Sequence, residues 1–167
     1  EAASAAARIG CSTCLITMAI SAIGRLSCNP AIGGMAKGQI VREVDALGGE
    51  MGRLADLSGI HFKMLGKSKG PAMWSPRSQN DKDLYPFFAQ QRLQEISNLT
   101  LIEGVVEDVI LRDGVVSQVL LQSGQRMECT SIVVCSGTFL SSRLHIGEQS
   151  EAGGRIGEPS SESLSET

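Results

Sequence analysis

Hydrophobic and polar positions in the first fifty residues alternate between helix-like and strand-like spacing. Glu1 to Ile9 is rich in alanine, which favours a helix, and Gly10 follows where a helix commonly ends. Cys11 to Met18 is a short apolar segment with β-branched residues, which predicts a buried strand. From Met35 to Leu47 the apolar residues recur at helical spacing. The pattern therefore predicts helix, strand and helix in that order.

The middle of the chain changes character several times. Ile60 to Leu65 alternates between apolar and polar residues, which predicts a strand. Gly66 to Gln79 is basic and contains glycine and proline, so we expect a loop. Leu84 to Ile96 then has helical spacing, and Asp83 stands where an N-cap is expected.

The second half predicts strands. Val105 to Leu111, Val115 to Leu121 and Gln125 to Thr130 are separated by the turn sequences Arg112-Asp113-Gly114 and Ser123-Gly124, which indicates a β-meander over roughly residues 104–130. Ser131 to Cys135 is a continuous apolar run, which is typical of a central strand in a parallel sheet.

This order of elements indicates an α/β fold. A helix and strand, then further helices, a β-meander crossover and a returning parallel strand are typical of a glutathione-reductase-like FAD-binding domain of Rossmann type. We expect residues 1–167 to be part of such a domain, without the first strand and the Gly-rich loop that would precede the first helix. Because that loop holds the pyrophosphate, we expect these 167 residues alone to bind FAD weakly or not at all and to have no enzymatic turnover.

Composition restricts the class of protein. The chain has 167 residues, of which 42% are apolar, and a formal net charge of −3. No apolar segment approaches the roughly 20 residues that cross a bilayer, so we expect no membrane association. The five cysteines are irregularly spaced, which argues against a disulfide framework and favours the cytoplasm. Cys11 and Cys14 have no second pair with zinc-site spacing, so we expect no metal.

Three segments carry a more specific signal. The first segment is Cys28-Asn29-Pro30-Ala31-Ile32-Gly33-Gly34, followed by Lys37-Gly38 and by Glu43 to Gly49. The second segment is Lys69-Gly70-Pro71-Ala72, followed by Arg77, Gln79, Asp81 and Tyr85. The third segment is Ser136 to Leu140, followed by His145-Ile146-Gly147, Gly153-Gly154-Arg155, Gly157 and Pro159. In this order and spacing they resemble the GidA/MnmG family of FAD-dependent tRNA-modifying enzymes.

The resemblance implies a function. Members of this family install a carboxymethylaminomethyl group at C5 of the wobble uridine of tRNA, with FAD as cofactor and with NADH and methylenetetrahydrofolate as cosubstrates. They act with a GTPase partner subunit and usually as homodimers. A protein similar to them is expected in the cytoplasm.

The resemblance also points to site residues. It places Cys28 near the flavin. Two interpretations of Cys28 are equally good: a catalytic thiolate, favoured by backbone N–H groups at the loop and helix start that follow it, or a small buried side chain packing a turn. Asn29, Gly33 and Gly34 would shape backbone close to the isoalloxazine ring. Further cofactor contacts fall on Val106, through its backbone, and on Ser161. Gly137 and Thr138 are expected near the cofactor for a different reason: they end the predicted parallel strand, and ligands gather at the carboxyl ends of strands in such sheets. Lys69 and Arg77, in a basic segment that contains Trp74, are candidates for binding the RNA substrate.

Two other functions remain open from the sequence. One is a generic FAD oxidoreductase that acts on a small molecule, although such an enzyme has no need for the Cys28–Gly34 and Lys69–Tyr85 segments. The other is a non-catalytic module that binds RNA through the basic loop.

Overall fold

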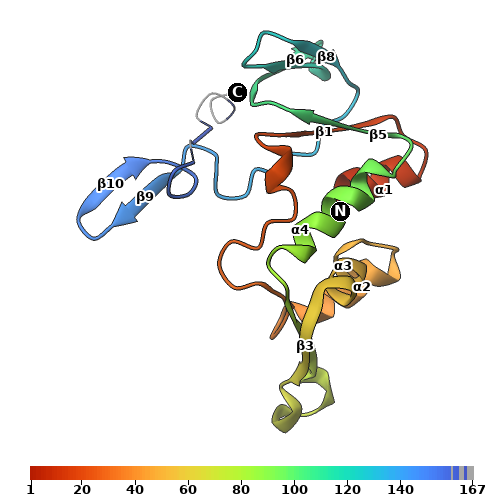
Figure 1. Cartoon of the computed structure of the whole chain (residues 1–167). Coiled ribbons are helices and arrows are strands. Elements are labelled where there is room, and N and C mark those ends of the chain that lie inside the picture. Colours follow the sequence, from red (N-terminus) through yellow and green to blue (C-terminus); the bar gives the residue numbers. More distant parts are fainter. Residues whose placement is uncertain (159, 162–163, 165–167) are drawn as a thin grey trace. The chain divides into compact units, whose positions relative to one another are not determined.

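The computed structural model describes residues 1–158, 160–161 and 164. The chain forms two compact units, Glu1–Ile102 and Glu103–Thr167. Figure 1 shows the elements of both units.

The first unit begins with a helix and a strand. Helix α1 spans Ala2–Arg8 and strand β1 spans Thr13–Thr17, which confirms the helix and strand predicted there. A 3₁₀ turn, η1, follows at Ile20–Ala22. Strand β1 pairs with β5, Leu99–Glu103, a strand that the sequence pattern did not reveal.

A three-stranded antiparallel sheet lies next in the chain. Its order is β2-β4-β3, with β2 at Ala31–Gly33, β4 at Ser75–Asn80 and β3 at Gly59–Leu65. Strand β3 confirms the predicted strand. The loop predicted from Gly66 to Gln79 was wrong in its second half, since β4 begins at Ser75. Only the first half is irregular, with 3₁₀ turns η2 and η3 at Lys67–Lys69 and Pro71–Met73.

Three helices complete the first unit. Helix α2 spans Gly38–Ala46 and α4 spans Leu84–Gln94, as the helical spacing predicted. Helix α3, Met51–Ser58, was not predicted. The core of the unit lies where α3 and α4 meet: Leu54 and Ala55 pack with Tyr85 and Ala89, and each of these four side chains is buried.

The cap of α4 differs from the expectation. The side chain of Asp83 makes no capping hydrogen bond. Asp81 Oδ1 instead accepts hydrogen bonds from the backbone N–H groups of Asp83 and Leu84, both at 2.9 Å. These two bonds lower the pKa of the Asp81 carboxyl, because they stabilise its charged form.

The second unit opens with the three predicted strands. Strands β6 (Val106–Arg112), β7 (Val115–Leu121) and β8 (Arg126–Glu128) form an antiparallel sheet in sequence order. Val119 and Leu121 are the buried side chains of β7. A hairpin of β9 (Arg143–Ile146) and β10 (Gln149–Ala152) follows and was not predicted.

The strand predicted at Ser131 to Cys135 is absent: no strand among the described residues includes this segment. Val133 and Val134 are 72% and 57% exposed. An apolar run becomes a strand only when another strand satisfies its backbone groups, and none of the strands described here pairs with it. In residues 1–158, 160–161 and 164, no helix is long and apolar enough to cross a membrane.

Candidate functional site

Gly33 and Gly34 stand where two backbone segments of the first unit meet. Gly33 has φ +84° and pairs with Arg77, and a Cβ at Gly33 would lie 2.3 Å from the carbonyl oxygen of Pro76. The N–H of Gly34 donates to the same carbonyl at 2.8 Å. The contact between β2 and β4 therefore requires the absence of a side chain at Gly33, whatever ligand lies near it. At Gly34 a Cβ would lie 3.7 Å from Arg77 Cδ, an ordinary contact, so glycine is favoured there only by its φ of +99°.

The junction is held by Ser75 and Gln39, neither of which was singled out from the sequence. The buried Ser75 hydroxyl donates to the carbonyl oxygen of Gly34 and lies 3.2 Å from Gln39 Oε1. A Cβ at Gly38 would lie 2.5 Å from the carbonyl oxygen of Pro76. The glycine at position 38 was the available signal for this contact. The junction fixes the backbone between β2 and α2 against the start of β4.

Cys28 and Asn29 lie in an exposed bend that precedes β2. The carbonyl oxygen of Asn29 accepts a hydrogen bond from the N–H of Ala31 at 2.6 Å. Helix α2 begins only at Gly38, with β2 between it and Cys28. The argument that a helix start activates this thiol was therefore wrong, and the alternative of a buried side chain in a turn was wrong as well.

Lys69 and Arg77 lie on the β3–β4 hairpin. Lys69 is exposed in η2, and its backbone N–H donates to the carbonyl oxygen of Gly66 at 2.9 Å. Arg77 Nη2 donates to Gln79 Oε1 at 3.2 Å. Arg77 also lies directly across from Lys63 in the register of the two strands. Lys63 belongs to the same basic stretch of the sequence as Lys67, Lys69 and Arg77, and the register places it beside Arg77.

Gly137, Thr138 and Ser161 lie in the second unit, and Ser161 contacts the residues that follow Thr138. Gly137 has φ +57°, and a Cβ there would meet no atom within 4 Å. The N–H of Ser161 donates to the carbonyl oxygen of Phe139 at 2.8 Å, and Ser161 forms a parallel bridge with Leu140. This contact places Ser161 beside the segment that begins at Gly137. Pro159 lies outside the described residues.

Two further features belong to the second unit. Val106 is the first residue of β6, is half-buried and pairs with Leu121. The ring of Phe139 packs over Gly154, where a Cβ would lie 2.0 Å from Phe139 Cδ1. The guanidinium of Arg155 lies 5.3 Å from the centre of the same ring, within cation–π distance. These contacts explain Gly154 and Arg155 of the third segment by packing.

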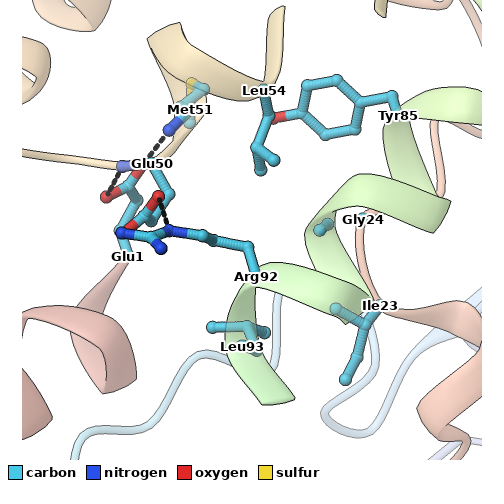
Figure 2. A pocket seen from close by; sticks show the side chains of 10 residues that line it. Glu1, Ile23, Gly24, Glu50, Met51, Leu54, Tyr85, Arg92 and Leu93 are labelled. Carbon is cyan, nitrogen blue, oxygen red and sulfur yellow. Dashed lines mark hydrogen bonds and ion pairs between the residues drawn. The ribbon is translucent and has the colours of Figure 1, made fainter. Parts of the chain in front are cut away.

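A pocket between α3 and α4 contains a buried carboxylate, that of Glu50 (Figure 2). Arg8 Nη1 lies 3.2 Å from Glu50 Oε1, and Arg92 Nε lies 3.2 Å from Glu50 Oε2. The hydroxyl of Ser4 donates to Oε1 at 3.3 Å. The hydrogen bond from Arg92 to Glu50 raises the pKa of Arg92. Three partners satisfy the Glu50 carboxylate, so it links helices α1, α3 and α4.

The same pocket contains the only tyrosine of the chain, Tyr85. Burial, with a smaller contribution from the negative charge of Glu1, raises the pKa of Tyr85 to about 12. The phenol is therefore neutral at physiological pH. Because the surrounding side chains are mostly apolar and the charges satisfy one another, the pocket is explained by the packing of the unit.

The cysteines at positions 11 and 14 show no sign of a reactive pair. Partial burial raises the pKa of the Cys14 thiol, which disfavours the thiolate that binds metals and attacks electrophiles. No cluster of three or more His, Cys, Asp or Glu residues suited to a metal ion occurs in residues 1–158, 160–161 and 164.

Comparison with known proteins extends over the whole chain. The family described as glucose inhibited division protein A (GidA) matches residues 1–167. The tRNA uridine 5-carboxymethylaminomethyl modification enzyme MnmG of Protochlamydia amoebophila is 47% identical over 165 residues, which are 99% of this chain and 26% of that protein. The MnmG of Phocaeicola vulgatus is 48% identical over 167 residues, 100% of this chain and 27% of that protein.

Solved structures agree. GidA of Aquifex aeolicus in its form I crystal superposes with a TM-score of 0.94 at 45% identity, over 99% of this chain and 28% of that one. The GidA-related protein of Thermus thermophilus shares the fold at 20% identity, with a TM-score of 0.61 over 99% of this chain and 60% of that one.

These matches confirm the α/β fold class and the resemblance inferred from the three sequence segments. The chain spans about a quarter of the length of the curated relatives it matches. With the family matched from the first residue to the last, the chain belongs to the GidA family.

Proposed function

We propose that this chain is part of a flavoenzyme that, with a GTPase partner, installs the carboxymethylaminomethyl group at C5 of the wobble uridine of tRNA. The supporting observation is the 47–48% identity, over the whole chain, to proteins named for that modification. The identity spans Cys28–Gly34, Lys69–Tyr85 and the third segment together. A generic FAD oxidoreductase or a simple RNA-binding module gives no reason for all three.

In this proposal, FAD contacts Val106, Gly137, Thr138 and Ser161 of the second unit. Gly137 is exposed, with its left-handed backbone next to open space, and this permits close approach of a ligand. Thr138 and the adjoining Ser161 add hydroxyl groups, and the backbone of Val106 is the proposed contact for the adenine. The Gly33 position is already filled by the carbonyl of Pro76, so its proposed role near the ring is limited to holding the backbone of Asn29 and Gly34. When bound, FAD supplies the redox chemistry, with NADH as reductant and a methylenetetrahydrofolate-derived carbon.

Cys28 is proposed as a catalytic residue on the grounds of exposure. A nucleophilic thiol must reach a substrate, and the side chain of Cys28 is exposed beside the fixed β2–β4 junction. That junction would hold Asn29 and Cys28 in a constant position relative to the first unit.

The RNA substrate would meet the β3–β4 hairpin. Lys69 and Arg77 are proposed to bind its phosphates, since both lie in a segment without acidic residues. We further propose that the whole protein acts as a homodimer, that both units belong to one FAD-binding domain with the meander at roughly residues 104–130, and that it works in the cytoplasm, where tRNA is modified.

The test uses the full-length protein that contains this chain. Its visible absorbance is recorded before and after addition of NADH. A flavin spectrum that bleaches is the expected result. A colourless protein that also takes up no added FAD would contradict the proposal and favour a module that only binds RNA.

A further inference from the structure

The β3–β4 hairpin carries positive charge that no nearby acid balances. Residues 59–80 include Lys63, Lys67, Lys69 and Arg77 and no Asp or Glu, a formal charge of +4. The whole chain has a charge of −3, so the remaining residues carry −7 (−3 minus +4). Within the part of the chain that the structure describes, no ion pair involves any of these four cations. The hairpin is thus a basic surface on an otherwise acidic chain.

The strand register brings two of these cations together. Lys63 of β3 is the direct partner of Arg77 of β4, and His61 is the partner of Gln79. Side chains directly opposite one another in antiparallel strands have Cβ atoms about 5 Å apart, and like charges at such positions are destabilising. A residue of either sign would be easy to place at the exposed position 63. Two cations across from each other therefore point to an anionic partner that neutralises both.

The face that carries this pair is turned away from helix α3, and only its start, at the buried Ser75, contacts α2 through Gln39. Residues two apart on a strand share a face, so Arg77 and Gln79 lie on one face of β4, and Ser78 and Asn80 lie on the other. Asn80 and Ser78 are buried, and Asn80 Nδ2 donates to the carbonyl oxygen of Ala55 in α3 at 2.8 Å. The exposed Lys63 and His61 belong to the first face. Contact with α3 thus occupies one face and leaves the basic one accessible.

The far end of the hairpin adds a different chemistry. The turns η2 and η3 connect β3 to β4, and Figure 1 shows them at the end of a hairpin that extends beyond α2 and α3. Lys67 and Lys69 are exposed there, and Trp74, the only tryptophan of the chain, is 44% exposed. Its backbone is fixed by a hydrogen bond from its N–H to the carbonyl oxygen of Pro71 at 3.1 Å. Lysines next to an exposed aromatic ring are suited to single-stranded RNA, whose phosphates and unstacked bases they can bind together.

We propose that Lys63 and Arg77 form a two-cation clip for the phosphate backbone of the RNA substrate, with Trp74 stacking on an unpaired base next to it. The proposal rests on the proposed function for its substrate. It adds Lys63 as a binding residue, and it assigns phosphate binding and base binding to different parts of the hairpin. The strand pair binds phosphates and the hairpin end binds a base of a loop region. A paired helix would offer phosphates to the clip but no unstacked base to Trp74.

The test measures binding of the full-length protein to an unmodified tRNA transcript with a wobble uridine, as a function of salt concentration. Each phosphate contact contributes about 0.7 to 0.9 to the slope of log K against log salt. Lys63→Gln and Arg77→Gln are each expected to lower that slope by about this amount, and the double variant by about 1.5. Affinity at 0.1 M salt should fall about fivefold for each substitution.

Controls separate charge from folding. Arg112→Gln removes a charge at the exposed end of another hairpin, β6–β7, and is expected to leave the slope unchanged. The exchange Lys63→Arg with Arg77→Lys keeps both charges and is expected to keep the slope. Trp74→Ala should weaken binding to the transcript about tenfold without changing the slope, because base stacking is worth about 1 to 3 kcal/mol and releases no counterions. Bound flavin is measured in every variant as the check of folding.

Each outcome decides the matter. If Lys63→Gln, Arg77→Gln and the double variant bind the transcript with the wild-type slope of log K against log salt, the clip is overturned and the proposed function remains intact. A charge-keeping exchange that binds as poorly as the neutral double variant would also overturn it, because charge would not be the cause. A flavin-containing wild-type protein that fails to bind the transcript would contradict the clip and the proposed function together.

Discussion

The carboxylate of Glu1 accepts a hydrogen bond from the backbone N–H of Glu50 at 3.0 Å, which joins the start of α1 to the start of α3. The other carboxylate oxygen of Glu1 accepts from the N–H of Met51. Figure 2 shows both contacts beside the Glu50–Arg92 pair. A side chain 49 residues away therefore caps α3, a helix of eight residues with glycine in its first turn. Such a helix depends on contacts from elsewhere in the unit.

The buried carboxylate of Glu50 is the first target for mutation. Glu50→Gln keeps the shape but leaves Arg8 without a charged partner and Arg92 with only the exposed Glu95, so we expect a loss of roughly 2 kcal/mol in the free energy of unfolding. The loss stays below that of a fully buried pair because the two arginine side chains remain 32% and 36% exposed. Glu95→Gln, at the exposed end of the same network, should cost at most about 0.5 kcal/mol. Denaturant titration of both variants makes the comparison, and equal losses would contradict a structural role for Glu50.

Alanine substitutions at Gly33 and Gly10 separate the free-energy cost of backbone strain from the cost of a steric clash. Both have positive φ, but a Cβ at Gly10 meets nothing within 4 Å, whereas a Cβ at Gly33 meets the carbonyl oxygen of Pro76. Gly10→Ala should cost about 1 kcal/mol from backbone conformation alone. Gly33→Ala should cost about 3 kcal/mol, because the β2–β4 junction must open as well. Thermal unfolding of the two variants measures the difference, and a Gly33→Ala protein as stable as Gly10→Ala would show that the junction is not tight.

Asp81 and Asp83 test which residue caps α4. Asp81→Ala removes two hydrogen bonds to the start of the helix and should lower the melting temperature by a few degrees at neutral pH. Asp83→Ala, which removes no capping bond, should leave it nearly unchanged.

The effect of Asp81 depends on pH in a defined direction. Its folded-state pKa lies below the ordinary value of 3.8. The stabilisation is therefore fully present above about pH 4, where the unfolded chain is also ionised, and it is lost as the pH falls through the lower folded-state pKa. The difference between wild type and Asp81→Ala should shrink on acidification. A difference that grows below pH 4 would contradict this assignment.

Gly137 carries a prediction about the cofactor. Its surroundings are open, so Gly137→Ala should lower stability by only about 1 kcal/mol, through its positive φ. If FAD lies against this backbone, the added methyl group should reduce the bound flavin of the full-length protein severalfold. Val106→Ala changes a side chain whose backbone alone is proposed to contact the cofactor, and bound flavin should change little. The absorbance ratio of flavin to protein measures both, and a Gly137→Ala protein with full flavin content would argue against the proposed contact.

The sequence predicted elements wherever local pattern decides them. The helices at α1, α2 and α4 and the strands β3, β6, β7 and β8 follow from apolar spacing and turn residues. Helix α3 was not predicted because the residue that caps it, Glu1, lies far away in the sequence. Strand β4 has the sequence SPRSQN, without β-branched or aromatic residues and with Pro76 in its interior, and it exists because β2 and β3 pair with it on both sides. The apolar run Ser131–Cys135 failed in the opposite sense, since its pattern is strand-like and its backbone has no partner strand among the described residues.

For the candidate site too, the sequence predicted which residues belong to it but not the contacts between distant segments. Family resemblance located Cys28–Gly34, Gly137–Thr138 and Ser161 in the chain. It did not reveal that Pro76 fills the space beside Gly33, or that Lys63 lies across from Arg77, because both are consequences of pairing with the unexpected β4. Contacts between distant segments decide which glycines serve packing and which cations cluster.

The most direct measurement of the central claim is nucleoside analysis of tRNA. The gene for the full-length protein is placed in a bacterial strain that lacks its own MnmG, and total tRNA is digested and examined by mass spectrometry. The account predicts that 5-carboxymethylaminomethyl groups return to wobble uridines, and that they do not return with an empty vector. Unmodified uridine in the presence of a soluble, flavin-containing protein would contradict the proposed function.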